Sequence, residues 1–139
     1  MEVTVDGFLC DDCNPWSKFG IMFCETTDND SKHFSLLITK SNGVHSFFRS
    51  ETGSPSFRIE GKDHSFTSNG GWMKITRSGN WFRSYFKATV EERYELIGEL
   101  ELDLAANALR GLALSSHDKY ASVSFSDFKL VSIAQHISG

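Results

Sequence analysis

The sequence predicts an all-β protein in which antiparallel strands form a two-sheet β-sandwich. Short segments alternate apolar and polar residues with a period of two, which places successive side chains on opposite faces of a sheet. Turn residues separate these segments at intervals of about 8 to 12 residues, a spacing typical of a sandwich. The twelve Phe residues of the chain suit a core of packed rings. We therefore expect about ten to twelve short strands and almost no helix.

The bulk composition bounds the class of protein. A chain of 139 residues, 23% of them charged, is expected to fold as one globular domain over residues 1–139. Its net charge of −4 provides no basic surface for nucleic acid and no polybasic patch for a membrane. The chain opens on a strand-like segment instead of a signal peptide, so we expect a cytoplasmic protein. Neutral or sugar-like ligands, or other proteins, fit this charge best.

In the N-terminal half, alternation and turn residues define the expected strands. Residues 19–25 are apolar on both faces, which predicts a central strand. In the next strand Phe34, Leu36 and Ile38 share a face, and Asn42-Gly43 is a hairpin signal that turns the chain back. The strands expected here are residues 2–9, 19–25, 33–39, 44–49 and, as a short edge strand, 57–59.

A β-hairpin around Trp72 and Trp81 organises the C-terminal half. Met73 and Ile75 share one face of its first strand, and Phe82, Ser84 and Phe86 share one face of its second. Ser78-Gly79-Asn80 supplies residues that tolerate the positive φ of a hairpin loop. Gly98 is expected to divide the following segment into two strands. The strands expected after the hairpin are residues 94–97, 99–104, 109–116 and 121–131.

Several short motifs occur in an order that resembles a known family. They include Gly20-Ile21-Met22, Leu37-Ile38-Thr39, Asn42-Gly43-Val44, Trp72-x-Lys74-x-Thr76-Arg77-Ser78-Gly79-Asn80-x-Phe82, Gly111-Leu112-Ala113-Leu114-Ser115-Ser116-His117 and Phe125-Ser126-Asp127-Phe128. Together they resemble the regulation-of-enolase-like family of concanavalin A-like lectin/glucanase β-sandwich domains. The resemblance covers roughly residues 16–131. It implies a jelly roll of the lectin type and, loosely, sugar binding, because this fold hosts many roles.

The chain departs from the family pattern at three places. Cys24 stands where the family usually has an arginine, which could hold a polar ligand by bidentate hydrogen bonds. Residues 89–94 replace the usual turn and tryptophan, and Tyr94 is expected to fill the tryptophan position. Family members commonly have more chain before the strand that contains Val3 and Val5. We therefore expect this strand to form an exposed edge, through which the domain pairs with a second copy or a protein partner.

The best candidate for a binding site is a set of aromatic and arginine side chains. Phe47 and Arg49 share a face of one strand, and Trp81, Arg83 and Tyr85 share a face of another. Flat rings suit the apolar side of a sugar, and planar donors suit its hydroxyl groups. We expect these five residues to form one face of a non-catalytic, lectin-like module that binds a glycan. A protein-interaction or structural module is the alternative, because Trp and Tyr are equally enriched at protein interfaces.

An acidic run offers a catalytic alternative. Glu99, Glu101 and Asp103 lie on one side of a predicted strand, as the carboxylates of retaining glycosidases with this fold do. Leucines alternate with them, so the solvated face of an amphipathic strand explains the run more simply. The sequence offers no convincing catalytic set, and a glycoside hydrolase is the least favoured function.

Metal sites are weakly indicated. Cys10-x-x-Cys13 has a metal-ligand spacing but needs further ligands such as Cys24 or His33, and three cysteines do not make a complete disulfide framework. Asp28-Asn29-Asp30 and Asp118 offer oxygen ligands without the glycine and distal glutamate of an EF-hand. The pair Ser116 and His117 would face opposite sides of a strand, which disfavours a catalytic triad. We expect neither a metal nor another cofactor.

Overall fold

The structure, a computed structural model, describes residues 2–8, 18–39, 43–59, 71–89, 91–115 and 123–129. These residues contain ten strands and no helix, which confirms the predicted all-β class. The strands are β1 (Glu2–Phe8), β2 (Lys18–Cys24), β3 (His33–Thr39), β4 (Gly43–Arg49), β5 (Phe57–Arg58), β6 (Gly71–Ser78), β7 (Trp81–Lys87), β8 (Glu95–Glu101), β9 (Leu109–Ser115) and β10 (Val123–Lys129).

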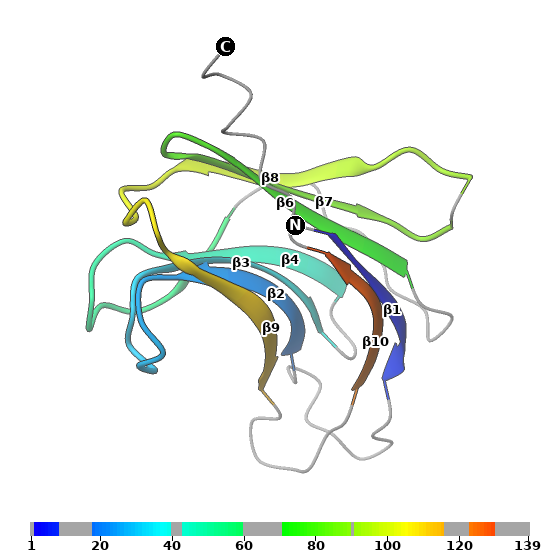
Figure 1. The fold of residues 1–139 in the computed structure, drawn as a ribbon, viewed down its shortest axis with the longest axis horizontal. Coiled ribbons are helices and arrows are strands. Elements are labelled where there is room, and N and C mark those ends of the chain that lie inside the picture. Colours follow the sequence, from blue (N-terminus) through cyan, green and yellow to red (C-terminus); the bar gives the residue numbers. More distant parts are fainter. Residues whose placement is uncertain are drawn as a thin grey trace.

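The ten strands form two antiparallel sheets of five strands each. Sheet A has the order β10-β1-β6-β7-β8, and sheet B has the order β5-β4-β3-β2-β9. Figure 1 shows β6, β7 and β8 above sheet B, with β1 and β10 at its side. The arrangement is that of a β-sandwich, in which each sheet turns one face inward and one face outward.

The core forms where the inward faces of the two sheets meet. Met73 and Ile75 of β6 and Phe82 and Phe86 of β7 are fully buried, as their alternation predicts. The Phe82 ring stacks on the Phe34 ring of sheet B, with 5.2 Å between ring centroids. The buried core comprises Phe19, Ile21, Phe23, Phe34, Leu36, Ile38, Val44, Met73, Ile75, Phe82, Phe86, Ile97, Leu102, Leu104 and Ala108. Because aromatic rings from both sheets interlock there, the relative position of the sheets is well defined.

The hairpin between β6 and β7 closes with a two-residue loop. Ser78 pairs with Trp81, so Gly79 and Asn80 alone form the turn. Gly79 has a φ of 60°, a left-handed conformation that glycine adopts without steric cost. The predicted hairpin is therefore confirmed, and it holds the side chains of β7 in a defined register.

Gly98 does not divide a strand, contrary to the prediction. Strand β8 runs unbroken through it, and the register with β7 shifts between Ser84 and Tyr85. A Cβ on Gly98 would lie 3.0 Å from the Ser46 Cβ of sheet B. The Ser84 hydroxyl also lies 3.0 Å from the Ser46 hydroxyl across the two sheets. Glycine is present here because the sheets approach closely, not because the strand ends.

Strand β1 is not an edge strand, which corrects a second prediction. It pairs with β10 on one side and with β6 on the other. Among the described strands, the edges are instead β10 and β8 in sheet A and β5 and β9 in sheet B. Strand β5 confirms the short edge strand expected at residues 57–59.

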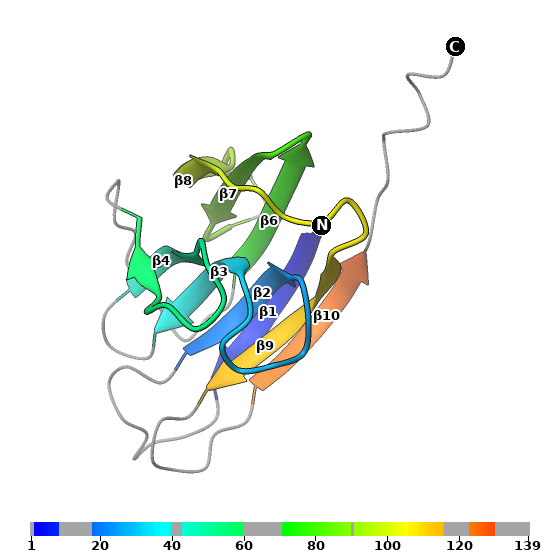
Figure 2. The ribbon, with the colours of Figure 1, turned by 90° about the vertical axis from the view of Figure 1, so that its left-hand side faces the viewer.

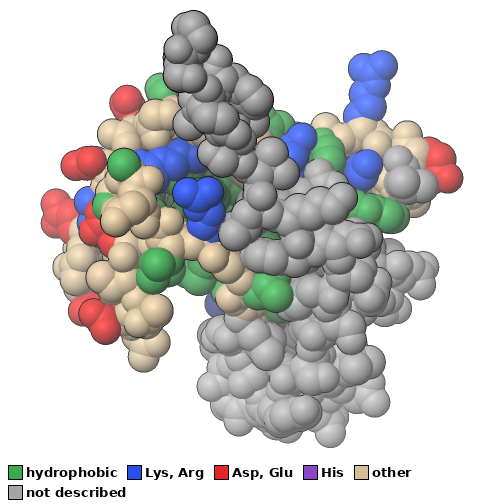
Figure 3. All heavy atoms as spheres, in the orientation of Figure 1, with side chains coloured by type: hydrophobic (Ala, Val, Ile, Leu, Met, Phe, Trp, Pro, Cys, Tyr) green, Lys and Arg blue, Asp and Glu red, His purple; other side chains and the backbone are tan. Residues whose placement is uncertain are grey.

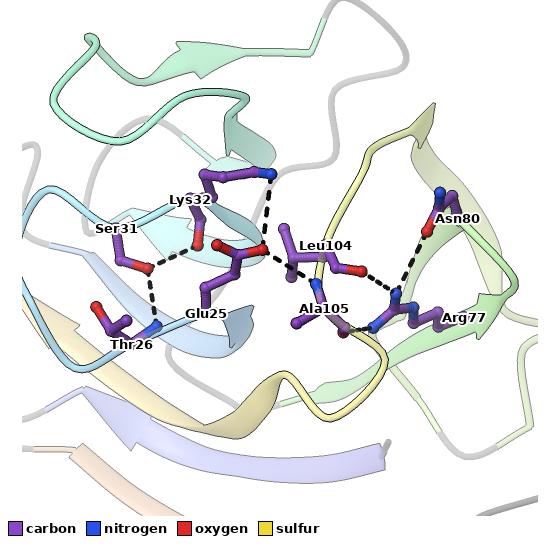
Figure 4. Close-up of polar contacts among 8 residues, drawn as sticks. All are labelled: Glu25, Thr26, Ser31, Lys32, Arg77, Asn80, Leu104 and Ala105. Atoms are coloured by element: carbon purple, nitrogen blue, oxygen red, sulfur yellow. Dashed lines mark hydrogen bonds and ion pairs between the residues drawn. The ribbon is translucent and has the colours of Figure 1, made fainter.

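A chain of polar contacts ties the two sheets together at one end of the sandwich (Figure 4). The Arg77 guanidinium, at the end of β6, donates to the carbonyl oxygens of Leu104 at 2.6 Å and Ala105 at 2.7 Å. The Ala105 N–H in turn donates to the Glu25 carboxylate at 3.0 Å, and Lys32 lies 3.6 Å from the same oxygen. The crossover from β8 to β9 thereby anchors the loop between β2 and β3, which borders the site described next.

Candidate functional site

A groove of about 840 Å³ crosses the outward face of sheet B. Figure 2 shows this face, with β4, β3, β2 and β9 side by side and the loops that follow β2 and β4 in front of them. Since Phe34, Leu36 and Ile38 turn into the core, the alternate residues His33, Ser35 and Leu37 of β3 turn outward and line the groove. The same alternation on β2 and β4 brings Met22, Cys24, Phe47 and Arg49 to this face.

The strand register arranges the floor of the groove in rows. One row runs from Arg49 through His33 to Cys24 and Leu109. The next runs from Phe47 through Ser35 and Met22 to Gly111. The first row therefore has polar side chains on β4 and β3, the second has an aromatic ring on β4 and a serine on β3, and both have apolar or small residues on β2 and β9.

Small residues make the floor hollow. Ser35 is fully buried, and its hydroxyl donates a hydrogen bond to the Phe47 carbonyl at 3.5 Å. This small side chain therefore takes up little of the groove. On β9, Gly111 has no side chain, and a Cβ built there would meet no atom of the described residues within 4 Å. The volume above Gly111 is thus open space that a ligand can occupy.

Arg49 fastens the two loops that border the groove. Its Nε donates to the Ser54 carbonyl at 2.6 Å, and its Nη1 donates to the carbonyls of Asn29 and Ser31 at 3.0 Å each. The first acceptor belongs to the loop after β4 and the other two to the loop after β2. Charge-assisted hydrogen bonds of this kind are about twice as strong as neutral ones. Arg49 is therefore chiefly a clamp on the walls of the groove.

His33 forms part of the groove wall beside Arg49. Its side chain is only 8% exposed, and its Nε2 lies 3.0 Å from the Ser56 hydroxyl. Its Nδ1 is enclosed without a hydrogen-bond partner among the described residues. Burial, together with the Arg49 charge, lowers the pKa of His33 to about 4, so the ring is neutral at pH 7. A buried polar atom without a partner often marks a place where water or a ligand completes the structure.

Lys18 and Cys24 occupy opposite ends of the β2 portion of the groove. The Lys18 ammonium leans over the Phe47 ring, 5.7 Å from its centroid. Burial lowers the pKa of Lys18 because removal from water penalises its charged form. Burial raises the pKa of the Cys24 thiol for the same reason, so the free thiol is the form favoured there.

The structure divides the five predicted binding residues between two surfaces. Phe47 and Arg49 line the groove on sheet B. Trp81, Arg83 and Tyr85 lie on β7 in sheet A, and they turn outward because Phe82, Ser84 and Phe86 are buried. The core separates the two sets, so the expectation that all five residues form one face is wrong. Alternation along a strand identifies the face of that strand but not the sheet to which the strand belongs.

The outward face of sheet A carries a different arrangement, which we call the aromatic face. It comprises Trp72, Lys74, Trp81, Arg83, Tyr85, Lys87 and Tyr94. The Lys74 ammonium lies 4.9 Å from the Tyr85 centroid and 4.3 Å from the Tyr94 centroid. Arg83 forms an ion pair with Glu99 at 3.0 Å and lies 5.8 Å from the Trp81 ring. Cations therefore occupy the spaces between the rings.

The acidic run lies in solvent. Glu99, Glu101 and Asp103 are exposed, whereas Leu102 and Leu104 are buried in the core. The amphipathic explanation of this run is thus confirmed, with Leu102 to Leu104 following the end of β8. Figure 3 shows further acidic side chains on the left-hand side of the molecule, where Figure 1 places the loops after β2 and β4.

The structure describes only some of the residues that the sequence offered as metal ligands or as a catalytic pair. Asp28, Asn29 and Asp30 are exposed loop residues. Cys24 and His33 are cross-strand neighbours, but Cys10, Cys13, Ser116, His117 and Asp118 lie outside the described residues. Within the described part of the chain, no three His, Cys, Asp or Glu side chains are grouped to hold a metal ion. None of the described segments is a helix long and apolar enough to span a membrane.

Sequence reasoning missed several residues of the groove, namely Lys18, Met22, Ser35 and Gly111. A usable signal was present, because serine, glycine and alanine recur at outward positions of β2, β3 and β9 and leave that face hollow.

Comparisons of the chain with protein-family models, with curated proteins and with solved structures returned no match.

Proposed function

We propose that this protein is a non-catalytic binding module that holds a carbohydrate in the groove on sheet B. The observation that carries the proposal is the mixed lining of the groove. Phe47, Met22 and Leu37 present apolar surface, and Ser56 and Asn29 present a hydroxyl and an amide group beside it. A sugar ring needs both, since it has an apolar face and a rim of hydroxyls.

The dimensions of the groove agree with this ligand class. A volume of about 840 Å³ falls within the range of about 300 to 1,000 Å³ that small-ligand sites occupy. The walls are held by the Arg49 hydrogen bonds before any ligand arrives. A site whose walls are already in place loses less conformational entropy on binding, which favours a weakly hydrophobic ligand such as a sugar.

The finer fold assignment belongs to the same proposal. We propose a jelly roll of the concanavalin A-like type and membership of the regulation-of-enolase-like family. Two five-stranded antiparallel sheets with interlocking aromatic rings support this assignment. An experimental structure in which the two sheets have another strand order would contradict it.

The test is a binding experiment with a blocked groove. A Phe side chain at position 111 projects into the open volume, so Gly111→Phe should abolish binding of any saccharide that the unaltered protein binds on a glycan array. Trp81→Ala, on the aromatic face, is the matched control and should leave binding unchanged. Binding that survives Gly111→Phe but is lost in Trp81→Ala would move the site to the aromatic face and refute the proposal.

A protein-interaction function is the second candidate, and strand β9 favours it. β9 is an edge strand of sheet B, and its Leu109 and Leu112 are 45% and 46% exposed. Exposed leucines on a strand edge favour pairing with another strand. Sedimentation velocity over a range of concentrations, with Leu112→Lys as the variant, tests pairing with a second copy. A concentration-independent monomer would contradict self-pairing.

A further inference from the structure

We propose that the free edge of strand β9 binds an extended peptide segment of another protein, which joins sheet B as a sixth strand and places an aromatic side chain over Gly111. This contact is separate from carbohydrate binding, and it gives the protein-interaction candidate a partner of defined chemistry. Three features of β9 carry the proposal, namely its unpaired backbone, an exposed leucine on its inward face and a gap on its outward face.

The backbone of β9 is unpaired along one side. Among the described strands, β9 pairs with β2 alone, at the margin of sheet B (Figure 2). None of residues 109–113 is buried, although they pair with a strand whose inward residues are in the core. Alternate residues along such an edge point their N–H and C=O groups away from the sheet, where a further strand can bond to them.

The core is incompletely covered at this edge. Leu112 belongs to the inward face of β9, because its cross-strand partner Ile21 is fully buried. Leu112 is nevertheless 46% exposed. A sixth strand would cover it with inward side chains of its own, and each Å² of apolar surface buried in this way contributes about 25 cal/mol. The incoming segment should therefore have apolar residues on its inward face.

The outward face of the same edge has a gap at Gly111. The cross-strand partner of Gly111 is Met22, and a Cβ on Gly111 would meet no atom of the described residues within 4 Å. An aromatic ring on a paired strand can cover a glycine of this kind and offset the packing that the glycine lacks. A ring opposite Gly111 would lie over the glycine and reach Met22 on its other side.

A second copy of β9 does not fill this gap. Residues 109–115 read Leu-Arg-Gly-Leu-Ala-Leu-Ser, so pairing of β9 with itself places no aromatic ring over Gly111 in any register. The edge is also short, because seven residues at about 3.3 Å each span about 23 Å. A contact of this length buries less than the roughly 800 Å² per partner that a stable interface between two folded proteins needs. A single extended segment is the occupant that fits.

The experiment is calorimetric titration with the synthetic peptide Lys-Thr-Val-Trp-Val-Thr-Lys. Its tryptophan matches Gly111, and its valines then fall on the inward face with Leu112. We expect this peptide to bind, and the same peptide with alanine in place of tryptophan to bind about tenfold more weakly. Two further peptides are methylated on one or the other set of alternate backbone nitrogens. Only one set faces β9, so one methylated peptide should fail to bind and the other should bind normally.

Two variants with the same substitution locate the contact. Leu112→Lys places a charge on the β9 edge and should abolish binding of the tryptophan peptide. Leu96→Lys is the matched control on β8, the edge of sheet A, where Leu96 is 41% exposed, and it should leave binding unchanged. Gly111→Thr fills the gap, so the tryptophan and alanine peptides should then bind equally. This variant also serves if Leu112→Lys does not fold.

The outcomes are independent of carbohydrate binding. If the tryptophan peptide does not bind at millimolar concentration, the proposal is overturned and the carbohydrate function is unaffected. Equal binding by both methylated peptides would show that the backbone of β9 takes no part and would overturn strand addition. Self-association that Leu112→Lys abolishes, without peptide binding, would give the edge to a second copy instead. A glycan array without any bound sugar would refute the carbohydrate function and leave the β9 contact standing.

Discussion

The outward faces of the two sheets are built by the same alternation of residues along their strands, yet one face is hollow and the other is filled by side chains. On sheet B, the outward positions include Ser35, Gly111 and Ala113, and the face is hollow over about 840 Å³. On sheet A, aromatic rings alternate with lysines, and Lys74 lies 4.3 Å from the Tyr94 centroid. Side-chain volume, not polarity, makes one face a groove and fills the other. A face rich in Trp and Tyr is therefore not necessarily the face that binds a ligand.

The arginines on the two faces show the same contrast. Arg49 donates three hydrogen bonds to the carbonyls of two loops, so it stabilises the fold around the groove. Arg83 forms an exposed ion pair with Glu99 on neighbouring strands. Exposed pairs contribute little to stability because water and salt screen them. The four predictions that follow test this contrast, beginning with the largest expected effect.

Arg49→Met should destabilise the protein by about 3 to 4 kcal/mol, because three loop carbonyls lose their charged donor at once. Urea unfolding monitored by tryptophan fluorescence measures the change. Arg83→Met is the matched variant on the aromatic face and should cost less than about 1 kcal/mol. Equal costs for the two substitutions would show that the Arg49 clamp contributes nothing particular to this fold.

His33 should make stability depend on pH in the acidic range. The pKa of His33 is about 4 in the folded protein and has its ordinary value of 6.5 in the unfolded chain. Below pH 6.5 the unfolded chain therefore binds a proton at His33 more readily than the folded protein does. The free energy of unfolding is therefore fully retained above pH 6.5 and should fall by about 3 kcal/mol as the pH drops to 4.

The matched variant for this prediction is His33→Gln, which can still bond to the Ser56 hydroxyl but does not titrate. Its free energy of unfolding should fall less than that of the unaltered protein between pH 7 and pH 4. Parallel curves for the two proteins would contradict the neutral, buried state of His33.

Gly111→Phe should weaken the binding of a saccharide at least tenfold, or about 1.4 kcal/mol, because the new ring occupies the groove. Its free energy of unfolding should change by less than about 0.5 kcal/mol, since a Cβ at this position meets no atom within 4 Å in the described part of the chain. Gly20→Ala is the contrasting variant, because its Cβ would overlap the Leu36 carbonyl and destabilise the sheet. Tight binding by Gly111→Phe would place the ligand elsewhere.

Trp81→Ala should have the smallest effect of the four changes, both on stability and on saccharide binding. The Trp81 side chain is 43% exposed, and its contact with Arg83 at 5.8 Å is worth about 0.5 to 1 kcal/mol at such a site. Calorimetric titration should give the same affinity for a saccharide as the unaltered protein. A loss of affinity comparable to that of Gly111→Phe would reverse the comparison between the faces.

Local sequence patterns predicted the strands and their inward faces well. Phe34, Leu36 and Ile38 are buried together, and so are Phe82 and Phe86, because a period of two fixes which side of a strand a residue occupies. The turn at Gly79 was equally local. These features need no knowledge of distant parts of the chain.

The candidate site was harder to predict because it depends on contacts between distant segments. Phe47 and Trp81 have the same alternation, yet one belongs to sheet B and the other to sheet A. Gly98 looked like a break, but its role is a close approach to Ser46, which lies far away in sequence. Arg49 donates hydrogen bonds to two loops, and the sequence does not show that these loops are neighbours. Sheet membership and loop contacts are non-local, so a single sequence does not reveal them.

The central claim is that ligand binds above sheet B and not on the aromatic face. Amide and indole chemical-shift mapping of the isotope-labelled protein, titrated with the tightest glycan of the array, tests it directly. We expect the shifted signals to belong to Met22, Ser35, Phe47 and Gly111, with those of Trp72, Trp81 and Tyr85 unmoved. Shifts confined to Trp72, Trp81 and Tyr85, with the floor of the groove silent, would contradict it.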